Sequence, residues 1–282
     1  MPRLSRPVTA VAAAAAALVL AGPPAQAMTG GRQLPAPGAA PWLATLAVKG
    51  DGPLLPRASC GGALVGEDTV LTAAHCLDGV DPARLEVHIG SSVLSRDPGV
   101  VRDLARTRLH PEYRLLPSPV DPGAPELSSA QYDIAVIRLA APVRGVRPLA
   151  LARHRPAPGA DAAMFSHGTV AAPDPSRPDV EIRGDVLRRG DLTAVPHGEC
   201  AAGTPATVDR ASTFCAGDRR GGGTTMCTGD SGSPLVVRQG RRPELVGIAS
   251  FGGETAGKRC GQPADAAFAD VAAVREWVAR AS

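Results

Sequence analysis

The sequence has 282 residues, of which 44% are hydrophobic and 20% charged, and its formal net charge is +3. This apolar content excludes a disordered chain, and 32 glycines with 28 prolines argue against a helical bundle because both residue types interrupt helices. No run of basic residues forms a nucleic-acid-binding patch, so the charge predicts no nucleic-acid partner.

The first 27 residues have the pattern of a secretory signal peptide. Arg3 and Arg6 precede an apolar run at residues 8–21, and Ala25-Gln26-Ala27 offers an A-x-A cleavage site. The run is shorter than the roughly 20 apolar residues that span a bilayer. An uncleaved helical anchor is the alternative to a cleaved leader. We expect export, removal of the leader, and an extracellular mature chain that begins at Met28 and has no membrane attachment.

After the leader, short apolar segments alternate with clusters of glycine and proline. Such spacing is typical of an all-β sandwich or of a pair of β-barrels. Helical periodicity is convincing only near the C-terminus, where Val271, Val274, Trp277 and Val278 fall on one face. A stretch rich in arginine and proline at residues 141–148 is the expected linker between two halves. The expected strands include residues 42–48, 85–89, 134–139, 235–237 and 245–250.

The cysteine count is even, which in an exported chain predicts disulfides. No two cysteines form a C-x-x-C pair, so we expect neither a zinc site nor a thioredoxin-like centre, and no metal. The residues alone leave the pairing open. The six cysteines are Cys60, Cys76, Cys200, Cys215, Cys227 and Cys260.

Three segments carry groups suited to nucleophilic catalysis. His75 ends the segment Leu-Thr-Ala-Ala-His before a cysteine, Asp133 lies in Tyr-Asp-Ile-Ala-Val-Ile, and Ser231 lies in Cys-Thr-Gly-Asp-Ser-Gly-Ser-Pro. A serine hydroxyl is a poor nucleophile at neutral pH and needs a neighbouring base. Taken singly, the histidine would more often be structural, the aspartate a capping residue and the serine a turn residue. Their joint occurrence favours catalysis.

Together these segments resemble the His, Asp and Ser motifs of the trypsin/chymotrypsin-like serine proteases, in that family's chain order. The similarity extends from Met28 to the C-terminal helix. It implies two antiparallel β-barrels closed by a C-terminal α-helix, with the first barrel at about 28–145, the second at about 146–268 and the helix at about 269–281. Further matches are Gly30-Gly31, Pro41-Trp42, Cys60-Gly61-Gly62 and His110-Pro111-Glu112-Tyr113.

The resemblance implies a secreted serine endopeptidase that acts through an acyl-enzyme. His75 would take the proton of Ser231 and return it to the leaving amine, while Asp133 would orient the imidazole. The backbone N–H groups of Gly229 and Ser231 would form the oxyanion hole. This chemistry requires no cofactor. The expected partners are protein or peptide substrates and proteinaceous inhibitors, and we expect a monomer.

The resemblance also implies a pairing of the cysteines and a route of activation. The family's sequential disulfides correspond to Cys60–Cys76, Cys200–Cys215 and Cys227–Cys260. In the family, a free apolar N-terminal residue pairs its ammonium with the aspartate before the nucleophile, which here gives Met28 with Asp230. No lysine or arginine immediately precedes Met28. Signal-peptide cleavage itself would therefore liberate the activating residue.

The primary specificity pocket implied by the resemblance carries no charge. Its base corresponds to Thr225, where trypsin-like members that cut after arginine or lysine have aspartate, and its walls correspond to Gly252 and Ala266. We expect small or medium apolar side chains to be preferred, because a buried cation would lack a partner. Residues 253–259 make the rim before Cys260 longer than usual.

Several positions depart from the family pattern. Ser233 replaces a glycine, Phe251 a tryptophan, and Ser166-His167-Gly168 replaces Gly-Trp-Gly. Serine at position 233 would restrict the backbone if that position needs a positive φ. None of these changes removes a catalytic group.

Three other interpretations were weighed against an endopeptidase. The α/β-hydrolase elbow G-x-S-x-G is absent, because Ser233 stands where its last glycine would be. A non-catalytic protease homologue that acts as a binding module is the main alternative, and the intact triad argues against it. An esterase-like preference on the same machinery would be distinguished by comparing ester with amide substrates.

Overall fold

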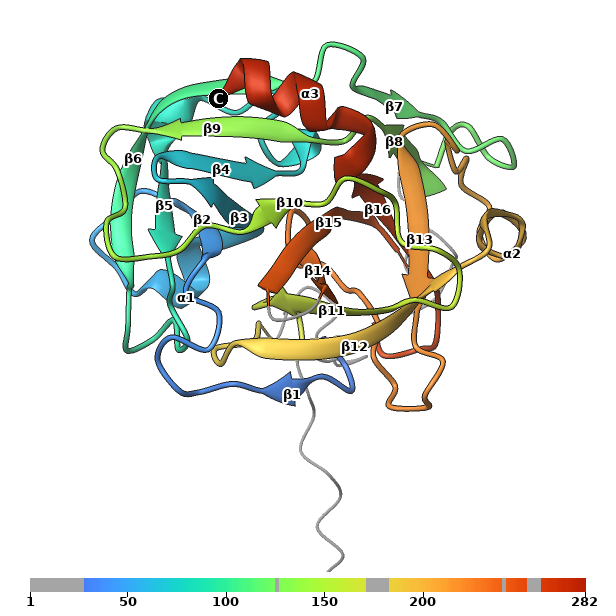
Figure 1. Ribbon diagram of the computed structural model, residues 1–282, viewed down its shortest axis with the longest axis horizontal. Helices are drawn as coiled ribbons and strands as arrows, with labels where there is room; N and C mark the ends of the chain where they lie inside the picture. Colours follow the sequence, from blue (N-terminus) through green and yellow to red (C-terminus); the bar gives the residue numbers. More distant parts are fainter. Residues whose placement is uncertain (1–27, 125–126, 171–182, 240–241, 253–259) are drawn as a thin grey trace, which may run out of the picture.

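The computed structural model describes residues 28–124, 127–170, 183–239, 242–252 and 260–282. The expected leader and the rim segment 253–259 lie outside these described residues. The chain builds one β-barrel, then a second beside it, and ends in a helix (Figure 1). The predicted all-β fold of two antiparallel barrels with a C-terminal helix is therefore confirmed.

The first barrel is closed by six antiparallel strands in the order β2, β3, β4, β9, β6 and β5. Side chains on the strands alternate between its interior and the solvent, as the alternating burial along β6 shows. The expected strands 42–48, 85–89 and 134–139 correspond to β2, β5 and β9. The bounds are β2 (Leu43–Val48), β3 (Ala58–Gly66), β4 (Thr69–Thr72), β5 (Leu85–Ile89), β6 (Val100–Leu109) and β9 (Ala135–Leu139).

The second barrel has the strand order β12, β11, β14, β15, β16 and β13. An additional antiparallel pairing of β12 with β13 closes the ring. The expected strands 235–237 and 245–250 lie within β14 and β15. The bounds are β11 (Asp161–Ser166), β12 (Arg188–Val195), β13 (Thr213–Gly217), β14 (Pro234–Gln239), β15 (Arg242–Phe251) and β16 (Ala266–Asp270).

Shorter elements complete the two barrels. Strand β1 (Arg32–Gln33) pairs with β12, and β10 (Ala150–Leu151) runs parallel to β15. A separate hairpin joins β7 (Arg114–Leu116) to β8 (Ser129–Gln131). The short helices are α1 (Leu54–Arg57), α2 (His197–Ala202) and two 3₁₀ turns, η1 (Ala74–Cys76) and η2 (Pro82–Arg84).

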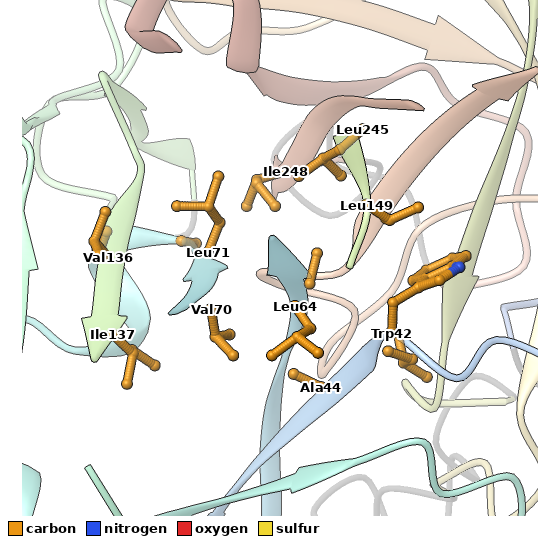
Figure 2. Packing of buried hydrophobic residues seen from close by; sticks show 14 of the residues in the cluster. Trp42, Ala44, Leu64, Val70, Leu71, Val136, Ile137, Leu149, Leu245 and Ile248 are labelled. Atoms are coloured by element: carbon orange, nitrogen blue, oxygen red, sulfur yellow. The ribbon is translucent and has the colours of Figure 1, made fainter. Parts of the chain in front are cut away.

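Aliphatic side chains from both barrels form one continuous core (Figure 2). Leu71 and Val136 come from paired strands of the first barrel, and Leu245 and Ile248 come from β15 of the second. All four are at most 1% exposed. Burying one such side chain contributes about 1.5–3 kcal/mol, so this shared core holds the two barrels against each other.

The C-terminal helix α3 (Val271–Ala281) packs against β10 and β15. It begins two residues later than expected, because β16 continues to Asp270, whose carboxylate accepts a hydrogen bond from the N–H of Ala272 as the N-cap. Val274 and Val278 are buried on its inner face, as the periodicity predicts. Within the described residues, no helix combines the length and apolar character needed to cross a membrane.

Candidate active site

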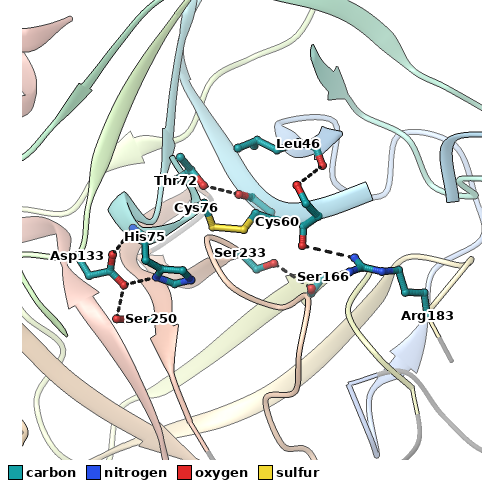
Figure 3. Close-up of a disulfide and its surroundings, with 12 residues drawn as sticks. Leu46, Cys60, Thr72, His75, Cys76, Asp133, Ser166, Arg183, Ser233 and Ser250 are labelled. Atoms are coloured by element: carbon teal, nitrogen blue, oxygen red, sulfur yellow. Dashed lines mark hydrogen bonds and ion pairs between the residues drawn. A yellow bond between two sulfur atoms is a disulfide. The ribbon is translucent and has the colours of Figure 1, made fainter. Parts of the chain in front are cut away.

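Strand pairing in the first barrel brings His75 and Asp133 together. His75 lies on η1, which follows β4, and Asp133 lies two residues before β9. Strands β4 and β9 are antiparallel neighbours, with Thr72 opposite Ala135. The end of one strand therefore meets the start of the other, and the two side chains face each other across that junction (Figure 3).

The Asp133 carboxylate receives three hydrogen bonds. Its Oδ1 accepts from the backbone N–H of His75 at 2.9 Å, and its Oδ2 lies 2.7 Å from Nδ1 of the same residue. The hydroxyl of Ser250, on β15 of the second barrel, donates to Oδ2 at 2.5 Å. Because Asp133 is only 1% exposed, these partners stabilise its ionised form and fix Nδ1 of His75 as the protonated nitrogen.

The two ionisable groups shift each other's pKa in opposite directions. Burial of the imidazole favours its neutral form, but the charge of Asp133 and its hydrogen bond outweigh burial and raise the pKa of His75. Burial likewise disfavours the charged form of Asp133. The charge and hydrogen bonds of His75, helped by the Ser250 hydroxyl, nevertheless lower the pKa of Asp133. The pair thus favours a carboxylate beside a histidine that readily accepts a second proton.

Groups of the second barrel also hold the backbone before Asp133. Tyr132 has a positive φ of 46°, which is uncommon for a residue other than glycine. Its N–H donates to Oγ of Ser212 at 2.9 Å. Sequence reasoning missed both Ser212 and Ser250, because each acts across the barrel interface. The only available signal was the position of Ser250, two residues before the expected pocket wall at Gly252.

The segment that carries Ser231 is a tight turn built around two glycines. Gly229 and Gly232 have φ values of 83° and 78°, which side chains with a Cβ rarely adopt. A Cβ on Gly232 would also lie 2.3 Å from the carbonyl oxygen of Gly61. The N–H of Gly61, on β3, donates to the carbonyl of Ser231 at 2.7 Å. The turn therefore packs against the first barrel, next to β3, the strand that contains Cys60.

A family model described as Trypsin matches residues 29–278. The chain belongs to the trypsin family. Trypsin alpha of Drosophila erecta is 32% identical over 225 residues, which cover 78% of this chain and 76% of the relative. The snake venom serine protease salmonase of Gloydius brevicauda is 31% identical, with 73% of this chain and 71% of the relative covered.

A solved structure gives the same assignment. Neuropsin, a serine protease expressed in the limbic system of mouse brain, matches with a TM-score of 0.68 and 28% identity. The match covers 89% of this chain and 97% of that structure. The enzyme class predicted from the motifs, a serine endopeptidase, is thereby confirmed.

The three disulfides join the pairs that the resemblance to the trypsin family implies. Cys60–Cys76 links β3 to the turn that carries His75, and Cys227–Cys260 anchors the start of the Ser231 segment. The third pair, Cys200–Cys215, links α2 to β13. Each bridge is expected to contribute about 3 kcal/mol by restricting the unfolded chain.

The first of these bridges lies directly beside the imidazole. The sulfurs of Cys60 and Cys76 and a ring nitrogen of His75 all fall within 4.8 Å of one another. Three donor atoms at such distances resemble a metal site. The two sulfurs are bonded to each other, however, so they offer no thiolate to a metal.

Two departures from the trypsin-family pattern contact each other. Ser233 and Ser166, which both replace family glycines, are at most 1% exposed, and their hydroxyls lie 2.9 Å apart. Positive φ in this turn belongs to Gly232, and Ser233 does not share it. Serine at 233 therefore causes no backbone strain. The condition under which Ser233 would restrict the backbone is not met, because the flanking Gly232 has the positive φ.

A residue that the sequence did not single out borders the expected specificity pocket. Thr225 is 2% exposed, and its hydroxyl has no hydrogen-bond partner among the described residues. The side chain of Met226 lies against the Gly252 wall of that pocket. A Cβ on Gly252 would lie 2.7 Å from Cε of Met226 and 3.7 Å from Cβ of Ala266. In the sequence, the only sign of a role for Met226 is its place next to Thr225. The direction of its side chain depends on the fold.

The expected N-terminal residue and its partner are both buried. Met28 is 0% exposed among apolar side chains of the second barrel. The carbonyl of Thr29 accepts a hydrogen bond from the N–H of Thr225 at 3.2 Å. Asp230 is also 0% exposed and accepts from the N–H groups of Gly168 and Cys227.

Proposed function

We propose that this member of the trypsin family is an exported endopeptidase with His75, Asp133 and Ser231 as its catalytic triad. The observation that carries the proposal is the buried Asp133 carboxylate, bonded at once to the backbone and to Nδ1 of His75. That arrangement leaves Nε2 of the ring as the free base. The leader pattern at residues 1–27, together with a relative named as a venom protease, supports export.

The reaction would proceed in two stages. Oγ of Ser231 attacks the carbonyl carbon of the substrate while Nε2 of His75 takes its proton, and Asp133 stabilises the imidazolium that forms. The N–H groups of Gly229 and Ser231 stabilise the oxyanion, and one such donor is worth about 3 kcal/mol. His75 then protonates the leaving amine. A water molecule, activated in the same way, hydrolyses the acyl-enzyme.

Labelling of the purified exported protein with a fluorophosphonate tests this assignment. We expect a single adduct on Ser231 by peptide mass spectrometry, because only an activated serine reacts at a useful rate. The adduct should be lost in His75→Ala, whereas a surface histidine variant, His154→Ala, should label normally. A folded protein that starts at Met28 and gives no adduct would favour the binding-module alternative.

We propose cleavage after small apolar residues such as alanine or valine. Met226 occupies space beside the Gly252 wall, and Thr225 offers only a neutral hydroxyl at the expected base of the pocket. A panel of peptides that differ only at the residue before the cut should give the highest kcat/KM for these side chains. In Met226→Ala the optimum should move to leucine or phenylalanine, with a gain of about tenfold. Dominant cleavage after arginine or lysine would contradict the proposal.

For activation, we propose that cleavage after Ala27 frees the Met28 ammonium to pair with Asp230. Burial of both residues and the bond between Thr29 and Thr225 support this pairing, because a buried carboxylate is stabilised by a neighbouring cation. N-terminal sequencing of the active enzyme should begin at Met28. A fully active enzyme with another N-terminus would contradict the pairing.

A further inference from the structure

A second groove lies outside the proposed catalytic and specificity residues. It has a volume of about 480 Å³, within the range of known ligand sites. Its walls come from the outer face of the second barrel, at β11, β12 and β14, and from the N-terminal segment that runs from β1 to the start of β2.

The floor of this groove is apolar. Trp42 packs edge-on against Phe165, with ring centroids 5.0 Å apart and an interplanar angle of 81°. Both residues line the groove, although their side chains are largely buried, with 7% and 9% exposed. Beside them, Ala163 on β11 lies directly opposite Val236 on β14, and both line the same groove. This surface suits an apolar side chain.

The rim of the groove carries more positive than negative charge. Four arginines and two aspartates line it. The aspartates are each engaged at 2.7 Å by one arginine, in the pairs Arg189–Asp191 and Arg220–Asp161. The remaining two arginines, Arg32 and Arg238, are exposed and have no ion-pair partner in the described part of the chain.

Two opposed arginines of the β1–β12 pairing differ in their partners. Arg32 lies directly opposite Arg189 across this antiparallel pairing. Arg189 is engaged by Asp191, whereas Arg32 has no such partner among the described residues. The charge of Arg32 is therefore available to a bound anion.

We propose that this groove binds an acidic segment of another protein. An apolar side chain of the segment contacts Trp42 and Phe165, and carboxylates before and after it pair with Arg32 and Arg238. A sulfated polysaccharide would match the charge but would leave the aromatic floor unused. The site lies apart from the triad, so binding does not require cleavage.

Calorimetric titration of the exported chain tests this proposal. The protein would carry Ser231→Ala so that the probe stays intact. The probe is a synthetic glutamate-rich peptide with one central phenylalanine, and its glutamine analogue serves as the uncharged comparison. We expect the acidic peptide to bind, to change the emission of Trp42, and to bind more weakly as salt is added.

Two variants test whether the acidic peptide binds in this groove. The double variant Arg32→Gln/Arg238→Gln should weaken binding about tenfold, because two exposed charge pairs are lost. Arg275→Gln, at an exposed position of α3, should bind as the parent does. All three arginines are exposed, so the thermal midpoints of these variants should agree.

Three results would overturn the proposal. One is equal affinity of the parent and the double variant, and another is equal binding of the acidic and glutamine peptides. The third is binding of a heparin oligosaccharide without any binding of the peptide, which would assign the groove to a polysaccharide.

Discussion

Replacement of Ser231 by alanine is expected to lower kcat on a good peptide substrate about 10⁶-fold, with little change in KM. The hydroxyl is the protein group that forms a bond to the substrate carbon in the proposed mechanism. Its loss leaves the pocket and the oxyanion donors in place, so substrate still binds while the acyl-enzyme cannot form. Steady-state kinetics on the peptide identified by the specificity panel provide the measurement.

Ser233→Ala is the matched control for that variant. Ser233 lies two residues away in the same turn and is fully buried, and its side chain bonds only to Ser166 among the residues that the structure describes. Its removal should cost about 1 kcal/mol in the free energy of unfolding and leave kcat within a few-fold of the parent. Similar losses of activity in the two variants would show that the turn as a whole, rather than the Ser231 hydroxyl, is required.

Asp133→Asn is expected to lower kcat/KM about 10⁴-fold. Asparagine fills the same volume, but its amide has a single acceptor oxygen where the carboxylate has two. The backbone N–H and Nδ1–H of His75 and the hydroxyl of Ser250 now donate to both oxygens. An amide nitrogen in place of Oδ2 would face Nδ1 as a donor. The ring would then hold its proton on Nε2, the nitrogen that has to act as base.

The same variant should move the pH profile. In the parent, kcat/KM requires neutral His75, whose pKa is raised above its usual value of 6.5 by Asp133. Activity therefore falls as the pH is lowered through that raised pKa. In Asp133→Asn the carboxylate no longer opposes burial, so the pKa of His75 falls and the acid limb moves to lower pH. A profile that keeps its midpoint would contradict the proposed role of Asp133.

The resemblance that the motifs carry predicted the two barrels, the cysteine pairs and the close approach of His75 to Asp133, whereas the residues alone left the pairing of the cysteines open. The motifs did not predict Ser250, Ser212 or Met226. Ser250 and Ser212 act across the junction of the barrels, and Met226 acts through a side chain directed toward Gly252; local patterns do not specify these directions. The sequence likewise does not specify whether position 233 needs a positive φ, and in the structure the neighbouring Gly232 has it.

The support of Asp133 from both barrels has a consequence for how the enzyme loses activity. The histidine that it orients belongs to the first barrel, whereas the hydroxyls of Ser250 and Ser212 come from the second. Any separation of the halves therefore removes part of the support of the carboxylate before either barrel unfolds. Catalytic activity reports on their association. If the chain were divided at the linker into two fragments, neither fragment would hydrolyse peptides by itself, and activity would return with their reassembly.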